Sequence, residues 1–406
     1  MHGLCSAVLA ICSHPEREKR EPRPSGVVLS YAVYGSQRAI SAVLANGLKV
    51  TDDAMLIVHV ASGSSGAPGW ITNSSRVIMN PTQLQIGKNN PLVLGAHLSN
   101  FKLCEAVGPC AGRSADGVRF VLMPTNGVLF RSGLEQWVLD HSMSFCTSYC
   151  TTFHVGDAAP RNNSLPGWQG SLEQLAWSAE HPSPVSVSIR DALRTGDDAN
   201  GAGWWTEPLV KLLRSGAVAN GNRMWAPMPA NAHTHEGAFY PVHLMRAFVH
   251  CALPATPFDA PLVTDGADFE ACKQMYRSAN LTAEAESPLG GCQFDEFLLP
   301  TFARQHYAHL VPTSSPPLIL VMWICANCAG AGASNATANT DLQKLYRHMR
   351  HHCAAYGHVF GFKAAKHQYV TTQNAIIGPL LRGVGAWPSC SNSSLLAAPA
   401  ARPHGE

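Results

Sequence analysis

The sequence predicts an α/β protein in which helices flank a central, mostly parallel β-sheet. Apolar, β-branched runs alternate with segments of helical periodicity through the first 140 residues, which is typical of parallel strands joined by crossover helices. Hydrophobic residues make up 46% of the 406 residues, so the chain can bury a large core. This content argues against a disordered protein, and the charged residues, at 14%, are well below the usual quarter.

The regular elements begin with a buried strand at Val27–Val33, because this apolar run is bounded by Gly26 and Gly35. A helix at Arg38–Val50 follows, since its apolar residues recur at helical spacing. The same two patterns predict strands at Met55–Val60, Val77–Met79 and Val118–Met123, and helices at Pro91–Val107 and from about Ser132 to His141.

The second half of the chain is less regular and contains Gly-, Asn- and Asp-rich loops. Periodicity predicts helices at Glu207–Arg214, Val242–Cys251, Phe294–Tyr307 and Asp341–Tyr356, and strands at Leu318–Ile324 and His358–Phe362. We expect one domain over residues 26–390. Residues 1–25 form an N-terminal segment, interpreted either as the remnant of a signal or anchor or as disordered, and residues 391–406 form a disordered tail.

The charge balance and the length of the apolar runs each exclude one class of partner. The formal net charge is +2 and no basic run is present, so no nucleic acid is expected as a ligand. The longest apolar run, Leu318–Ala326, is far shorter than the roughly 20 residues that cross a bilayer. We therefore expect no transmembrane segment in this chain.

Cysteines and glycosylation sequons bear on the compartment. The chain has 13 cysteines, and Asn-X-Ser/Thr sequons begin at Asn73, Asn162, Asn280, Asn335 and Asn392. Together they predict a glycoprotein with disulfides in the oxidising lumen of the secretory pathway. A cytoplasmic location remains the alternative, because sequons arise by chance and thiols also pack as small hydrophobic groups.

The familiar catalytic motifs are absent, so any site must be assembled from dispersed residues. The sequence has no Gly-x-Gly-x-x-Gly, P-loop, Gly-x-Ser-x-Gly or His-Glu-x-x-His motif. Asp295 and Glu296 open the predicted helix at Phe294–Tyr307. A carboxylate at a helix start is held ionised by the helix dipole, so it suits a base that acts on a hydroxyl group. A plain helix cap is the structural alternative.

Phe294–Thr301 resembles the Ser-Pro-Asp-Glu-x-x-Trp-x-Thr block of the core-2/I-branching β-1,6-N-acetylglucosaminyltransferases, with Phe-Asp in place of Pro-Asp. Other segments resemble this family in the same order across residues 26–385. They are Leu56–Val60, Phe120–Asn126, His235–Tyr240 and Val359–Lys363. After the first of these segments, Ala61 stands where the family has Asp, and after the third, Arg246 comes one residue late for the family's Arg. The chain is thus similar to a divergent member of this glycosyltransferase family.

The resemblance implies a GT-A-like, Rossmann-type domain that transfers a sugar with inversion. The donor would be a UDP-sugar carrying GlcNAc or xylose, the acceptor a carbohydrate hydroxyl, and the compartment the Golgi lumen. Relatives typically need no metal, and the loop Pro124–Gly127 agrees because it carries no Asp-x-Asp. The UDP-sugar is then a co-substrate, and no cofactor is expected.

The resemblance also assigns roles to single residues. Glu296 would be the catalytic base, and Lys363 would contact the donor phosphates. The matched segments and the loops at the strand ends together give the expected donor-binding residues, which are Tyr34, Gly35, Ser36, His59, Thr125, Asn126 and Lys363. The expected acceptor-binding residues are Glu236, Tyr240 and Trp225; the aromatic rings of Trp225 and Tyr240 could stack on a sugar, with burial in the core as the structural alternative. The donor crevice should form between Tyr34–Gln37, Ala61–Ser65 and Lys363, because ligands of parallel sheets gather at the carboxyl ends of the strands.

Two other functions stay open at this point. Ala61 and the pair Thr125-Asn126 are compatible with a non-catalytic carbohydrate-binding or degenerate transferase-like protein. A zinc-dependent hydrolase or zinc-stabilised binding protein would instead use a cluster of cysteines and histidines, namely Cys325, Cys328, His348, His351, His352 and Cys353.

Overall fold

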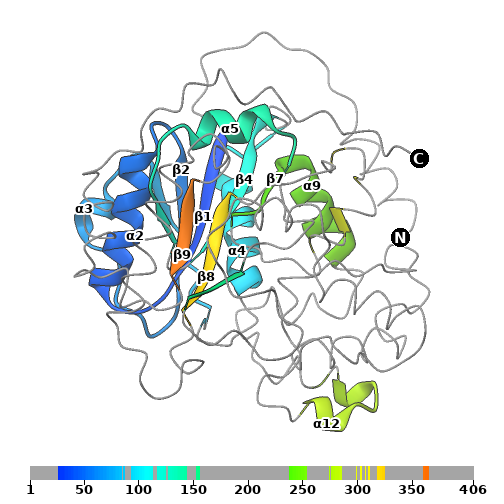
Figure 1. Cartoon of the computed structure of the whole chain (residues 1–406). Helices are drawn as coiled ribbons and strands as arrows, with labels where there is room; N and C mark the ends of the chain where they lie inside the picture. Colours follow the sequence, from blue (N-terminus) through cyan, green and yellow to red (C-terminus); the bar gives the residue numbers. More distant parts are fainter. Residues whose placement is uncertain are drawn as a thin grey trace, which may run out of the picture.

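The computed structural model (Figure 1) describes residues 26–84, 86, 93–112, 117–124, 127–143, 152–155, 237–253, 274, 276–285, 299, 302–303, 307, 310, 318–324 and 360–364. The N-terminal segment 1–25 and the tail 391–406 lie outside the described residues. So do the predicted helices at Glu207–Arg214 and Asp341–Tyr356 and most of the helix at Phe294–Tyr307.

A mixed, mostly parallel sheet forms the centre of the described fold. Its strand order is β3-β2-β1-β4-β7, and all neighbours are parallel except β4 and β7. The prediction that the first three long strands lie parallel in one sheet is confirmed. The strand bounds are β1 Val27–Val33, β2 Met55–Val60, β3 Val77–Met79, β4 Arg119–Met123 and β7 Phe239–Pro241.

Helices cover both faces of this sheet, and for this reason β1 is buried along its whole length. Alternate residues of β1 face opposite helices. Tyr31 lies under Gly47 of α2 (Gln37–Val50), and Ser30 hydrogen-bonds His97 of α4 (Val93–Val107). Asn100 of α4 also joins this helix to the sheet, because its side-chain amide donates to Ser30 Oγ and to two strand carbonyls. The alternation of helices and strands thus yields an α/β fold.

A second sheet packs against the α2 side of the first. Its strand order is β5-β9-β8-β6, with β5 antiparallel to β9 and the other neighbours parallel. Leu129, Ile319 and Phe360 join the same buried core as β1, and Figure 1 shows β8 and β9 in front of β1 with α4 behind it. The strand bounds are β5 Gly127–Leu129, β6 Thr152–Val155, β8 Ile319–Ile324 and β9 Gly361–Ala364.

One buried side chain connects α2 to the edge of this second sheet. The Asn46 amide donates to Leu129 O at 2.9 Å, and its Oδ1 accepts from Leu129 N at 2.7 Å. Phe130 N donates to Phe360 O, so the polar groups of Leu129 point away from β9 and toward α2. Asn46 therefore satisfies an edge that would otherwise carry two buried, unpaired groups.

The remaining described helices are short. The predicted helix at Val242–Cys251 is an α-helix that continues as a π-helix. The short helices are α3 Gly69–Thr72, α5 Leu134–Asp140, α9 Val242–Ala247, the π-helix η2 Phe248–Ala252, and α12 Thr282–Ala285. Within the residues that the structure describes, no helix has the length and apolar character needed to cross a membrane.

Candidate functional site

The order of the strands predicts a ligand site at the carboxyl ends of β1 and β4. From β1 the chain moves outward through β2 to β3, and it then crosses to β4 on the other side of β1. The connections that leave β1 and β4 therefore run in opposite directions. Such a reversal opens a gap beyond the strand ends, where ligands of open α/β sheets bind.

The loop after β1 leads into the start of α2. Gly35 has φ +109°, a left-handed conformation that favours glycine, and Ser36 Oγ caps the helix by accepting from Ala39 N. Gly35, Ser36 and Arg38 are exposed. The first turn of α2 contains no acidic residue but does contain the Arg38 cation, so both the helix dipole and a side chain favour an anion here.

The loop after β2 is joined to the loop after β1. Gly35 N donates to Ser64 Oγ at 3.1 Å, and Ser65 N donates to Gly35 O at 3.2 Å. Open space faces the backbone of both loops, because a Cβ added at Gly35, Gly63 or Gly66 would meet no other group of the described residues within 4 Å. A ligand can therefore approach the main chain closely at this point.

The loop after β4 lies beside β9. Gly127 N donates to Pro124 O, which closes the loop, and Gly127 then pairs with Lys363 of β9. The backbone register thus brings the strand that carries Lys363 next to the loop at the carboxyl end of β4. Thr125 and Asn126, the two expected donor residues in this loop, lie outside the described residues.

His59 lies inside the core. Its side chain is fully buried, and Nε2 accepts a hydrogen bond from Leu84 N at 2.8 Å. Burial lowers the pKa of His59 to about 4, so the ring is neutral at pH 7, and its Nδ1 has no hydrogen-bond partner within the described part of the chain. In this position the His59 ring fixes the main chain at Leu84 by a hydrogen bond, and it has no exposed surface that a ligand could contact.

Tyr240 and Ala61 are also buried. Tyr240 lies on β7 opposite Phe120 and is 1% exposed, and burial raises the pKa of its hydroxyl. Its ring therefore has no open face for a sugar in this structure. Ala61 packs with Ala32 and Ile86 at the end of β2, so this position supplies no carboxylate. Tyr34, the first residue after β1, is partly buried against the same group.

The other expected contact residues, Glu296, Glu236 and Trp225, lie outside the described residues, as does the cysteine and histidine cluster from Cys325 to Cys353. Over the ranges given for the structure, no group of three or more His, Cys, Asp or Glu side chains is arranged to hold a metal ion.

Arg38 was not predicted from the sequence, although the signal was present. A basic residue in the first turn of a predicted helix, close after the Gly35-Ser36 pair that follows a strand, opposes the helix dipole unless an anion is nearby. The link between Gly35 and the loop after β2 was not predicted either, because no local pattern indicates it.

Comparison with known proteins adds no relative: no family model, no curated protein and no solved structure matches this chain. The family resemblance therefore rests on the sequence segments quoted for it.

Proposed function

We propose that this chain is an inverting, metal-independent glycosyltransferase with a GT-A-like domain, which moves GlcNAc or xylose from a UDP-sugar to a carbohydrate hydroxyl in the Golgi lumen. One observation carries the proposal. The loops after β1 and β2 are hydrogen-bonded to each other beside the start of α2, at the reversal of strand order, with open space over their glycines. This arrangement suits a nucleotide diphosphate.

The diphosphate needs fixed positive groups when no metal is present. The free N–H groups at the start of α2, the Ser36 hydroxyl and the exposed Arg38 would face it from one side. Lys363, on the strand beside the loop after β4, would supply a second cation from the other side. Together these groups would stabilise the negative charge that develops on the leaving diphosphate.

The transfer itself requires a base on the far side of the sugar. A carboxylate at Glu296 would take the proton from the acceptor hydroxyl as its oxygen attacks the anomeric carbon and the bond to the diphosphate breaks. Asp295 is the rival, but adjacent residues at a helix start point about 100° apart, so only one of them can face the donor. The position of the second acid in the family's block favours Glu296.

The test measures sugar transfer and UDP affinity in matched variants. Glu296→Gln should lower turnover by about 10²–10⁴-fold, the usual effect of a positioned base, and leave UDP affinity unchanged. The matched control, Asp295→Asn, should keep most of the activity. Near-wild-type transfer by Glu296→Gln would show that this carboxylate is not the base.

A non-catalytic sugar-nucleotide-binding protein is the second candidate, and one observation favours it. Ala61 is buried among alanine and isoleucine neighbours, so the position where the resemblance expects a carboxylate is apolar. This candidate predicts UDP binding with no transfer to any acceptor, in the wild-type chain as well as in the variants. Release of UDP over a panel of sugar acceptors separates the two candidates.

A further inference from the structure

A disulfide closes the end of helix α4, at the edge of the sheet opposite the proposed nucleotide site. It joins Cys104, in the last turn of α4, to Cys110, and both cysteines are fully buried. Gly108 N also donates to Cys104 O, which ends the helix within the closed loop. The disulfide therefore fixes the course of the segment that follows α4.

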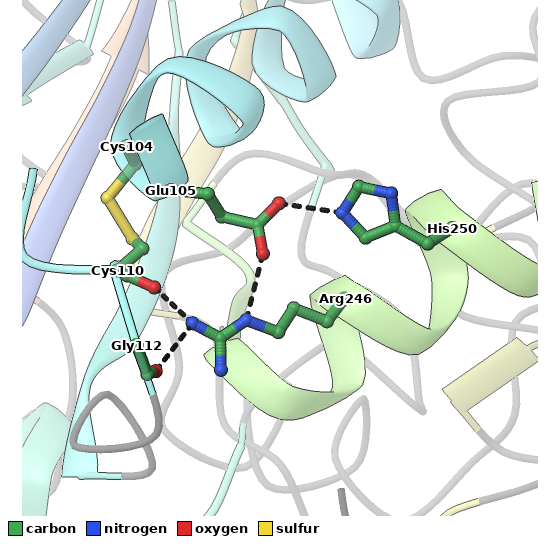
Figure 2. Close-up of polar contacts among 6 residues, drawn as sticks. All are labelled: Cys104, Glu105, Cys110, Gly112, Arg246 and His250. Atoms are coloured by element: carbon green, nitrogen blue, oxygen red, sulfur yellow. Dashed lines mark hydrogen bonds and ion pairs between the residues drawn. A yellow bond between two sulfur atoms is a disulfide. The ribbon is translucent and has the colours of Figure 1, made fainter. Parts of the chain in front are cut away.

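Helix α9 docks on this segment through Arg246 (Figure 2). Arg246 Nε donates to Glu105 Oε1 at 2.8 Å, and its terminal amino group donates to the carbonyl oxygens of Cys110 and Gly112. The Arg246 guanidinium thus hydrogen-bonds a carboxylate and two main-chain carbonyls at the same time. This geometry depends on the path of the chain from Glu105 to Gly112.

His250, one turn further along, uses the same carboxylate. Its Nε2 lies 2.8 Å from Glu105 Oε2, so both oxygens of Glu105 are hydrogen-bonded by side chains of α9 and η2, as Figure 2 shows. Burial by itself would raise the pKa of Glu105, but the hydrogen bonds from His250 and Arg246 lower it below its ordinary value. The carboxylate therefore stays ionised and holds the two elements together.

Within the described residues, Arg246 and His250 form these hydrogen bonds with the disulfide-closed segment and with the residues just after it. Opening the disulfide frees the path of this segment, whose residues Ala106, Val107, Ala111 and Gly112 are exposed. The carbonyls of Cys110 and Gly112 then lose their fixed positions relative to Glu105. The docking of α9 is thereby coupled to the state of one covalent bond.

We propose that the Cys104–Cys110 disulfide is a redox-dependent latch that docks α9 and η2 onto α4. A dithiol reductant opens it by exchange: the S–S bond breaks, Cys104 and Cys110 become thiols, and the two reductant thiols form a disulfide. Since both sulfur atoms are buried, exchange proceeds from an opened form of the segment. The latch does not depend on the proposed transferase activity.

The Cys251 thiol provides a direct readout of the docked state. It lies on η2 beside His250 and is 4% exposed. Release of η2 should expose this thiol to an alkylating reagent, whereas the docked form protects it. Peptide mapping distinguishes Cys251 from the two cysteines of the disulfide.

The test compares the full wild-type chain with a Cys104→Ser, Cys110→Ser variant by amide hydrogen exchange. We expect the amides of Val242–Ala252 to exchange about tenfold faster or more in the variant, while the amides of β1 and β2 stay protected. Dithiothreitol should produce the same change in the wild-type chain, with Cys104, Cys110 and Cys251 all alkylated.

The variant Arg246→Gln keeps the disulfide and removes the docking cation, so it should release α9 to the same extent. Combining Arg246→Gln with the cysteine substitutions should increase the exchange rate of the α9 amides little further, because both changes act on the same contact. Unchanged protection of α9 in the cysteine variant overturns the latch. If the amides of β1 and β2 also lose protection in the cysteine variant, the latch is overturned, because the disulfide would then support the whole fold. A disulfide that stays intact in dithiothreitol overturns the latch too.

Discussion

Removal of the Asn46 side chain should destabilise the fold far more than an average substitution on a helix. The Asn46 side chain forms two hydrogen bonds with the main chain of Leu129, and both residues are buried. Asn46→Ala leaves the Leu129 N–H and C=O without a partner and without access to water. It also frees β5, which follows the loop at the carboxyl end of β4 and pairs with the strand that carries Lys363.

The magnitude follows from these two bonds. Each hydrogen bond contributes a net of about 1 kcal/mol, and leaving a buried group unpaired adds further cost. We expect Asn46→Ala to lower the free energy of unfolding by about 2–4 kcal/mol. UDP affinity should fall as well, because the strand that carries Lys363 loses its support.

Urea unfolding followed by tryptophan fluorescence measures this loss, since Trp137 packs against Phe239 and Phe360 in the same core. The matched control is Asn73→Ala, an exposed asparagine at the end of α3, which should change the free energy by less than about 0.5 kcal/mol. Both variants are compared in unglycosylated protein, because Asn73 lies in a sequon. A loss below about 0.5 kcal/mol for Asn46→Ala would refute the reasoning.

Three further predictions concern other parts of the fold. Between pH 6.5 and about 4, wild-type protein should lose about 3 kcal/mol of stability through His59, because the unfolded imidazole takes up a proton that the buried ring does not. His59→Gln should lack this part of the loss, and equal pH slopes in urea unfolding would contradict it. Glu135→Ala removes the acceptor for the N–H groups of the turn Asp52–Ala54 and should cost about 1–2 kcal/mol, measured in the same way; an unchanged midpoint would count against it. Gly237→Ala places a Cβ 2.6 Å from Ile319 Cγ1 at φ +77° and should cost about 1–3 kcal/mol, whereas a neutral effect would place the two sheets differently.

The elements buried on both faces were predictable from local sequence. The run Val27–Val33 and the run Met55–Val60 are the observed β1 and β2, because strands covered by helices on both faces read as continuous apolar segments. The predicted helix at Arg38–Val50 is α2, which begins at Gln37. For β1, β2 and α2, the pattern of apolar residues alone was enough to predict the element.

The short strands β5 and β7 were not predictable, because they depend on distant partners, whereas the equally short β3 was predicted at Val77–Met79. β5 and β7 have three residues each, and β7 ends in Pro241, which disfavours a strand in local terms. β5 forms by pairing Gly127 with Lys363, and no local pattern indicates a partner so far along the chain. The disulfide follows the same rule, since 13 cysteines allow many pairings.

The candidate site was predictable as loops but not as side chains. The rule that ligands lie at the carboxyl ends of parallel strands indicates the loops after β1, β2 and β4. It does not say which side chains of a strand face the core, and the burial of His59 and Tyr240 follows from tertiary packing. Sequence alone therefore overestimates the number of residues that reach a ligand.

Calorimetric titration of the full chain with UDP, in EDTA and again with Mn²⁺, tests the central claim most directly. We expect binding of equal affinity in both buffers, because fixed cations and helix N–H groups replace the metal. Lys363→Gln should weaken binding by roughly tenfold to a hundredfold, the loss of a charge-assisted contact of about 1.5–3 kcal/mol. Binding that appears only with Mn²⁺, or no binding of UDP in either buffer, would contradict the account.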